Sequence, residues 1–242
     1  EKAAKKNREL INLKEEITEW EKLNEDLKEL EELDGWGDKD LENEIEELRQ
    51  NEDNMTKKPE WLDDTIYPYK PFISIEEGKF ILEDPRTIFN WKNFIIQKIV
   101  KDKKWKDLPY EDRIKTIWYF VIDWLDYKYD VLEDWQPSFF SYYRRYGDCE
   151  DSSLFFIDLC RASNIPADKI FLCCGWYIDT SGNKFGHAFP IIKLNDNSFY
   201  IYETTLNFHA DVPKLFKNSN YDCSWGLMND KWYGKSTIGD NF

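Results

Sequence analysis

The apolar residues of this chain change their spacing part-way along, and this change limits the folds available to it. Up to residue 162 they recur mostly at intervals of three and four, the period of a helix that buries one face. Three short apolar runs follow at residues 169–177, 186–194 and 199–205, with the length and composition of β-strands. Helices that precede a sheet along the chain predict an α+β fold, with helices packed on an antiparallel sheet.

The first 53 residues are set apart by their charge and by a narrow apolar stripe. They contain 20 acidic and 9 basic residues, so they carry most of the formal net charge of −15. The stripe recurs every three or four positions on either side of residues 34–37, which predicts a helical hairpin or a coiled-coil arm. Its members are Leu10, Leu13, Ile17, Trp20, Leu23, Leu27, Leu30, Leu41, Ile45 and Leu48. Two interpretations stay open: a solvated helical spacer, or an arm for self-association or docking.

Residues 54–84 are expected to connect this arm to a main domain at residues 85–242. Four X-Pro steps in and next to this stretch favour an extended backbone.

The main domain is expected to place its helices before its strands. The predicted helices cover residues 88–100, 109–125 and 149–162, the second opened by Pro109. The last two strands are joined by a predicted turn at Asn195–Ser198, and the tail after Asn207 is expected to be irregular coil.

Composition excludes several classes of protein. The chain has 242 residues, of which 41% are hydrophobic, enough for one full core and too many for a disordered chain. The acidic net charge opposes general nucleic-acid binding, and no apolar run reaches the roughly 18 residues of a membrane span, so neither partner is expected. The polar start at Glu1 lacks the apolar segment of a signal peptide and suggests a fragment or a processed chain.

The five cysteines are an odd number in a chain too long to need disulfide bonds. Reduced thiols are therefore expected, as in the cytoplasm or in a larger particle such as a virion. Cys173 and Cys174 are adjacent on a predicted strand and point to opposite faces, which argues against a shared metal ion. Neither a metal nor a cofactor is expected.

Cys149 is the most informative residue, because it lies where a tight turn becomes a helix. Asp148 and Asp151 resemble a capping pair, which places Cys149 in the first helical turn. Backbone N–H groups and the helix dipole favour a thiolate at that position, whereas the neighbouring acids oppose it. A basic partner is therefore required.

The chain has two histidines, and His187 is the better candidate for that partner. It starts a predicted strand, whereas His209 lies in the irregular tail. Antiparallel pairing with the next strand brings Glu203 towards the imidazole, where a carboxylate would orient the ring and stabilise imidazolium. The sequence thus offers a nucleophile, a base and an orienting acid in that order.

Three segments resemble the transglutaminase-like, papain-fold cysteine hydrolase superfamily, including bacterial transglutaminase-like cysteine proteinases. They are Gly147-Asp148-Cys149-Glu150-Asp151, Gly186-His187-Ala188-Phe189 and Tyr202-Glu203-Thr204-Thr205. The gaps of 37 and 15 residues between the three candidate residues fit the pattern, and Trp135-Gln136-Pro137 resembles the segment that precedes the cysteine in bacterial members. The resemblance covers roughly residues 85–207.

The resemblance implies a papain-like core and a thiol mechanism on a peptide or protein substrate. Cys149 would attack an amide, peptide or isopeptide carbonyl, His187 would carry the proton, and a thioester would form. Gln136 would donate to the oxyanion together with the backbone N–H of Cys149. One departure is Glu203, because members of the superfamily usually have Asp there. Acyl transfer to an amine, which crosslinks proteins, and an inactive structural or docking role stay open as alternatives.

Overall fold

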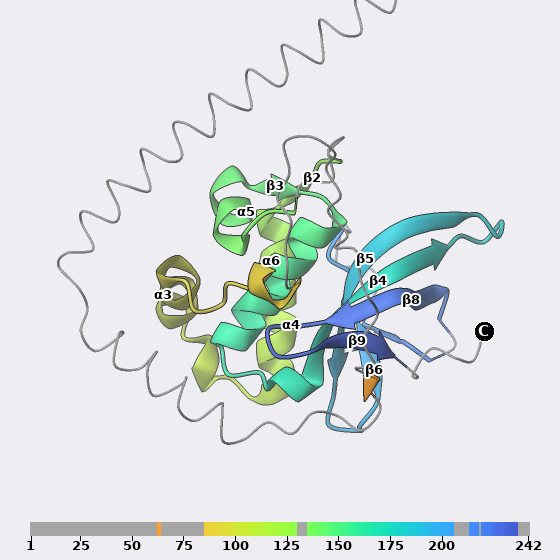
Figure 1. Ribbon diagram of the computed structural model, residues 1–242. Helices are drawn as coiled ribbons and strands as arrows, with labels where there is room; N and C mark the ends of the chain where they lie inside the picture. Colours follow the sequence, from red (N-terminus) through yellow and green to blue (C-terminus); the bar gives the residue numbers. More distant parts are fainter. Residues whose placement is uncertain (1–61, 64–84, 130–134, 206–212, 218, 237–242) are drawn as a thin grey trace, which may run out of the picture. The chain divides into compact units, whose positions relative to one another are not determined.

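The computed structural model describes residues 62–63, 85–129, 135–205, 213–217 and 219–236 (Figure 1). The chain divides into two units, residues 1–54 and 55–242, and the described residues belong to the second. The predicted arm of residues 1–53 lies outside the described residues, and so does the predicted connector apart from Leu62–Asp63.

The described chain combines helices with an antiparallel sheet, as the change in apolar spacing predicts. The helices are α3 (Phe94–Lys103), α4 (Tyr110–Trp124), α5 (Ser138–Arg144) and α6 (Cys149–Ala162), with 3-10 turns at Pro85–Ile88, Trp105–Asp107 and Ala167–Lys169. The strands of the main sheet are β1 (Leu62–Asp63), β4 (Ile170–Ile178), β5 (Lys184–Lys193), β6 (Phe199–Ile201), β7 (Lys214–Leu215), β8 (Tyr221–Met228) and β9 (Tyr233–Ser236). Their order is β1-β9-β8-β4-β5-β6-β7, and every pairing is antiparallel.

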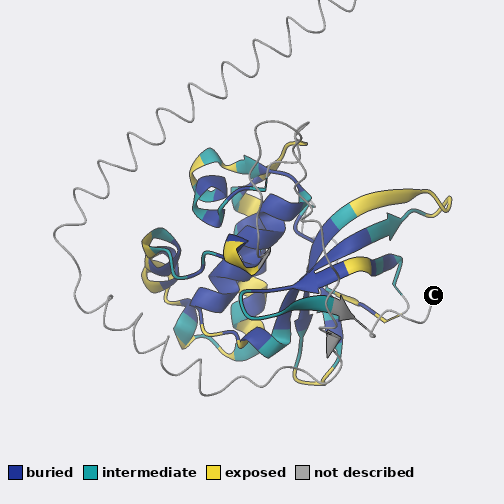
Figure 2. Cartoon of the chain, viewed as in Figure 1, coloured by how far each residue is buried: buried dark blue, intermediate teal, exposed yellow. Residues whose placement is uncertain are grey.

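Helix α6 is the centre of this fold, and the predicted range of residues 149–162 is confirmed. It packs against α3, α4 and α5 and against strands β4 and β5. Every residue from Glu150 to Ala162 is buried, so the helix is dark blue along almost its whole length (Figure 2). A helix buried on all sides is held rigidly, which fixes the position of the residue at its start.

The first predicted helix is shorter than its apolar spacing suggests. Helix α3 begins at Phe94, because the side chain of Asn93 accepts a hydrogen bond from the backbone N–H of Ile95 and caps it. Ile88 and Trp91 are buried before the helix starts. Helix α4 follows Pro109 directly, close to the predicted position.

The predicted irregular tail is wrong, because β7, β8 and β9 all lie after Asn207. Strand β8 pairs with the central strand β4, and its register shifts between Cys174 and Trp176. This irregularity and Gly226, whose φ is +153°, obscure the alternation that marks a strand in a sequence. The turn at Asn195–Ser198 is confirmed, with Asn197 at a φ of +65°.

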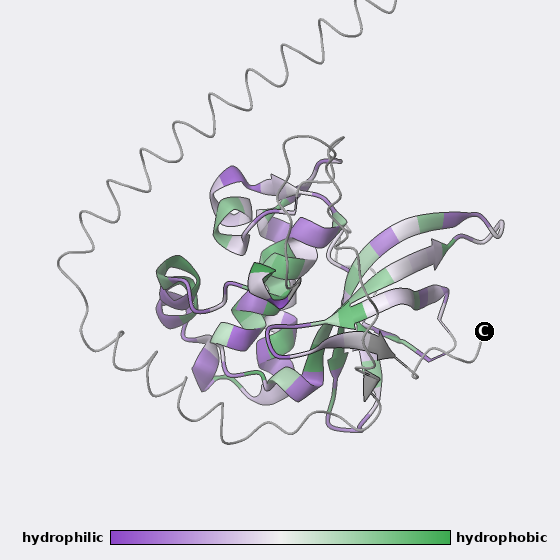
Figure 3. Cartoon of the chain, viewed as in Figure 1, coloured by the Kyte–Doolittle hydropathy of each residue, from purple (hydrophilic) through white to green (hydrophobic). Residues whose placement is uncertain are grey.

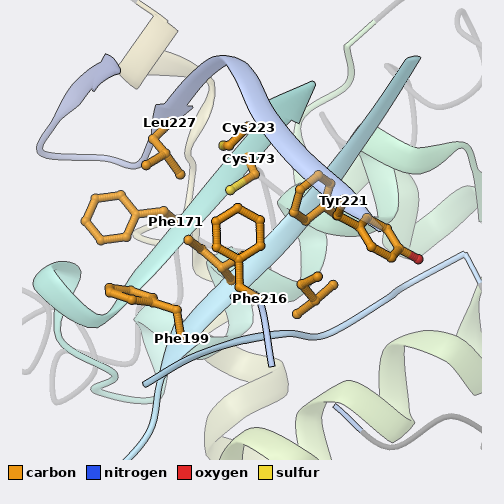
Figure 4. Close-up of a cluster of buried hydrophobic side chains, with 10 residues drawn as sticks. Phe171, Cys173, Phe199, Phe216, Tyr221, Cys223 and Leu227 are labelled. Atoms are coloured by element: carbon orange, nitrogen blue, oxygen red, sulfur yellow. The ribbon is translucent and has the colours of Figure 1, made fainter. Parts of the chain in front are cut away.

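Apart from the core around α6, a second hydrophobic cluster covers one face of the sheet (Figure 4). It consists of Phe171, Cys173, Phe189, Ile191, Phe199, Ile201, Phe216, Tyr221, Cys223 and Leu227. In β4 and β5 these residues alternate with those that face α6. Figure 4 shows Tyr221 at the edge of the cluster, with its hydroxyl oxygen directed away from the other labelled side chains.

The strands β4 and β5 change character along their length. They are hydrophobic and buried where they pass α6, and more polar and exposed towards the tip of their hairpin (Figures 2 and 3). In the part of the chain that is described, no helix is both long and apolar enough to cross a membrane.

Candidate active site

The first turn of α6 lies where strands β5 and β6 separate. Tyr202 donates its backbone N–H to the carbonyl of Pro190, which continues the ladder one residue beyond β6. Two residues before Pro190 in β5, the backbone of Ala188 bonds to the helix instead. Its N–H donates to the sulfur of Cys149, and its carbonyl accepts from the Ser153 hydroxyl at 3.3 Å. The start of α6 thereby takes the place that a longer β6 would occupy beside β5. Strand β6 is therefore shorter than the predicted residues 199–205.

This arrangement brings the sulfur of Cys149 to the backbone of the residue that follows His187 in the chain. The imidazole lies on the face of the sheet that carries the second hydrophobic cluster. Its ring stacks on Phe189 at 5.8 Å and contacts the rings of Tyr177 and Tyr221 at 6.4 and 5.9 Å. These contacts restrict the orientation of the ring.

Glu203 meets His187 directly. Nε2 of His187 lies 2.9 Å from Oε2 of Glu203, and both side chains are nearly buried, with 13% and 11% of their surfaces exposed. Extending the β5–β6 register puts Glu203 opposite Phe189, so His187 is its diagonal neighbour two residues along. The diagonal is longer than a direct pair, and the long side chain of Glu203 spans it.

Four donors surround the carboxylate of Glu203. Oε2 accepts from His187 and from the Tyr221 hydroxyl at 2.9 Å, and Oε1 accepts from the backbone N–H and the hydroxyl of Thr205 at 3.0 and 2.8 Å. Burial raises the pKa of this carboxyl, but the bonds with His187 and Thr205 outweigh it and lower the pKa to about 2. Trp118 holds the backbone, donating its indole N–H to the Glu203 carbonyl at 2.7 Å. Glu203 is therefore a fixed anion.

Three residues of this region were not predicted from the sequence. Tyr221 lies in the tail that was expected to be irregular, so nothing in the sequence pointed to it. Thr205 follows Glu203 by two residues, the spacing of local side chain to backbone bonds, and this signal was available. Tyr127 pairs with Gly147 in the small parallel sheet of β2 (Asp126–Tyr127) and β3 (Tyr146–Gly147). Burial and then the nearby Cys149 raise the pKa of Tyr127 to about 12.

The surroundings of Cys149 favour its neutral thiol over the thiolate. Burial is the largest cause of a strong rise in its pKa, and the charge of Glu150 is the next, against which the Ala188 N–H acts in the opposite direction. The thiol donates to Oε2 of Glu150 at 3.1 Å. Asp148 is the residue before the helix as predicted, but its side chain makes no capping bond. The expected capping pair is therefore wrong, because Asp151 accepts instead from the backbone N–H of Gln136.

Glu150 and Asp148 form an acidic pair next to the thiol. Burial, followed by a hydrogen bond with Asp148, raises the pKa of Glu150 to about 10, so the pair holds a proton at neutral pH. One ligand atom each of Asp148, Cys149 and Glu150 lies within 4.8 Å of the others, a spacing that fits a metal ion. Carboxylate oxygens suit a hard cation such as Ca²⁺ or Mg²⁺. Gly147 permits the close packing here, since a Cβ on it would lie 2.6 Å from that of Asp151.

Gln136 is buried at the same end of α6. Its backbone N–H donates to Asp151 at 3.1 Å, and its side-chain oxygen accepts from Arg144 at 2.8 Å. With the oxygen held by Arg144, the amide nitrogen is left as the side-chain donor. The structure thus places Gln136 and Cys149 at the first turn of α6, and it pairs His187 with Glu203. A thiol, an imidazole held by a carboxylate, and nearby N–H donors are the groups used in nucleophilic acyl transfer.

Comparisons with known proteins give structural neighbours of low similarity. No family model matches the chain, and no curated protein matches its sequence. It is similar to a protein of Cytophaga hutchinsonii provisionally described as a cysteine protease, at 17% identity and a TM-score of 0.39 over 50% of this chain. That match spans only 40% of the Cytophaga protein.

LapG of Legionella pneumophila is a second neighbour. One structure matches 60% of this chain and 88% of its own at 14% identity, with a TM-score of 0.43. A calcium-bound structure of LapG matches 81% and 95% at 13% identity, with the same TM-score. Similarity at this level does not assign roles to residues, so those roles depend on the geometry of the site itself.

Proposed function

We propose that this domain is a transglutaminase-like, papain-fold thiol hydrolase that cleaves an amide, peptide or isopeptide bond. The observation that carries the proposal is the 2.9 Å contact between His187 and Glu203, one residue along β5 from the Ala188 backbone that bonds to Cys149. A histidine that only fills space in a core has no need of a buried carboxylate. A general base becomes positively charged when it takes a proton, and a fixed carboxylate stabilises that charge. Hydrolysis is favoured over crosslinking because water needs no second binding pocket.

In the proposed reaction Cys149 attacks the substrate carbonyl while His187 removes its proton. Glu203 occupies Nε2, so Nδ1 is the nitrogen that receives the proton. The backbone N–H of Cys149 and the side-chain amide of Gln136 donate to the oxyanion. His187 then returns the proton to the leaving amine, a thioester remains on Cys149, and water hydrolyses it with His187 as base.

The raised pKa of Cys149 favours one of two forms of this mechanism. A preformed thiolate–imidazolium pair requires a low thiol pKa, whereas burial and the acidic pair raise it. The proposal therefore includes general-base activation, in which the proton moves as the carbon–sulfur bond forms.

The test is a peptide library of defined sequences, digested by the full chain and read by mass spectrometry. Cleavage is expected with the parent chain and not with Cys149→Ala or His187→Ala, and an acid quench is expected to trap acyl groups on Cys149. Cys160, buried in the same helix, is the internal control for nonspecific acylation. Cleavage that persists in Cys149→Ala would overturn the proposal.

A second candidate is an inactive scaffold that keeps the fold, and the raised Cys149 pKa is the observation in its favour. It predicts neither cleavage nor acylation. It also predicts that iodoacetamide modifies Cys149 as slowly as Cys160 at every pH up to 9. Faster alkylation of Cys149 that depends on His187 contradicts the scaffold.

A further inference from the structure

The segment that carries Glu203 is tied to the first turn of α6 by the next residue, Thr204. The hydroxyl oxygen of Thr204 lies 3.0 Å from Oγ of Ser152 and 3.2 Å from Oγ of Ser153. All three of these side chains are buried. The two serines follow Cys149 by three and four residues, so Thr204 meets the turn that carries the thiol.

The acceptors of this cluster show which hydroxyl donates across it. Ser152 donates to the carbonyl of Asp148 at 2.8 Å, and Ser153 donates to the carbonyl of Cys149 at 2.6 Å. A hydroxyl has one proton to donate, so these two short bonds use both serine protons. Thr204 is therefore the donor to the serine oxygens, and its proton joins its own segment to the helix.

The side chains on either side of Glu203 face the helices, whereas Glu203 itself faces the imidazole. The ring of Tyr202 stacks on Phe156 of α6 at 5.7 Å, and the hydroxyl of Thr204 meets the same helix. Between them, Glu203 lies 2.9 Å from His187. The position of the carboxylate and the hold on α6 thus belong to adjacent residues, so a shift of this backbone moves both.

His187 has a matching link on β5. The next residue, Ala188, donates its backbone N–H to the sulfur of Cys149, and its carbonyl accepts from the Ser153 hydroxyl at 3.3 Å. The base and the acid of the proposed site are therefore each followed by a residue that bonds to the first turn of α6. Two attachments from different segments fix the turn, whereas a single attachment leaves it free to pivot.

We propose that Thr204 is a positioning residue of this site, whose hydroxyl holds the turn that carries Cys149 in place against Glu203. Because Glu203 orients His187, the same bond sets the thiol relative to the imidazole. A misplacement of about 1 Å between reacting groups can lower a rate about a hundredfold. The inference rests on the proposed function and adds a residue to its mechanism.

The first test reads the link itself and needs no turnover. Thr204→Val keeps the size and branching of the side chain and removes the hydroxyl. Relative to the amides of β4, hydrogen exchange measured by NMR is expected to become about fivefold faster at the N–H of Ser152, in the first turn, and of Thr205, which donates to Glu203. The matched control is Ser163→Ala, which removes a buried hydroxyl at the other end of α6 and should change neither rate. Unchanged exchange in Thr204→Val overturns the proposal.

The second test reads catalysis on the peptides that the parent chain cleaves. Thr204→Val is expected to lower kcat about tenfold with little change in KM, because no group that binds substrate is removed. Thr204→Ser restores the donor and is expected to recover most of kcat, and Ser163→Ala should keep it. An unchanged kcat in Thr204→Val, or an equal loss in Thr204→Ser, overturns the positioning role and leaves the proposed function intact. No cleavage by the parent chain overturns the proposed function, and with it the role of Thr204 in a reaction.

Discussion

Tyr221 and Glu203 lie 18 residues apart in the chain, yet the tyrosine hydroxyl donates to Oε2 of the carboxylate at 2.9 Å. The same oxygen contacts His187, so the tyrosine helps to hold the anion that orients the imidazole. Tyr221 belongs to β8, whose pairing with β4 carries it to this place. The candidate site therefore depends on a strand that the sequence did not reveal.

Tyr221→Phe is expected to destabilise the domain by about 1–2 kcal/mol, because it removes one hydrogen bond to a buried anion. Activity is expected to fall as well, with a larger change in kcat than in KM. Tyr177→Phe is the control, since the Tyr177 ring also contacts His187 but its hydroxyl bonds to none of the described residues. Urea unfolding and peptide hydrolysis measure the two effects; equal effects of both variants would refute the role of the hydroxyl.

Glu203→Gln is expected to change the acid limb of stability. The folded pKa of about 2 lies below the ordinary value of 4.5, so the carboxylate stabilises the fold fully above pH 4.5 and loses this effect as the pH falls towards 2. That contribution is on the order of 3 kcal/mol. The difference in unfolding free energy between parent and variant should therefore shrink between pH 4.5 and 2.5. A constant difference across this range would contradict the assignment.

Asp158 predicts a pH effect of the opposite sign. It is buried in α6, where burial raises its pKa to about 8 although the hydroxyl of Ser138 and the N–H of Asn90 donate to it. The folded state holds the proton between pH 4 and 8 and the unfolded state does not, so stability falls as the pH rises through this window. Asp158→Asn should weaken this dependence in urea titrations. The exposed Asp102→Asn should leave it unchanged.

Gln136→Ala is expected to lower kcat about a hundredfold, because one donor to the oxyanion is lost. Alkylation of Cys149 by iodoacetamide should not change, since that reaction forms no oxyanion. Arg144→Ala should reduce kcat less, because Arg144 only holds the oxygen of the amide. An unchanged kcat in Gln136→Ala would remove this residue from the mechanism.

The sequence by itself determined the central helix and the candidate residues. Local patterns were enough to predict α6 and the turn at Asn195–Ser198, because helix spacing and turn chemistry depend on neighbouring residues. Local motifs also singled out Cys149, His187 and Glu203 as candidates. The order of these elements was also sufficient for the α+β fold.

Only the tertiary structure decided the sheet and the state of the site. Strands β8 and β9 form through pairing with distant strands, and a register shift hides that pairing from the sequence. The pKa of Cys149 could not be read from its place at a helix start. Burial and the neighbouring acids raise that pKa, and burial depends on every element packed around the residue.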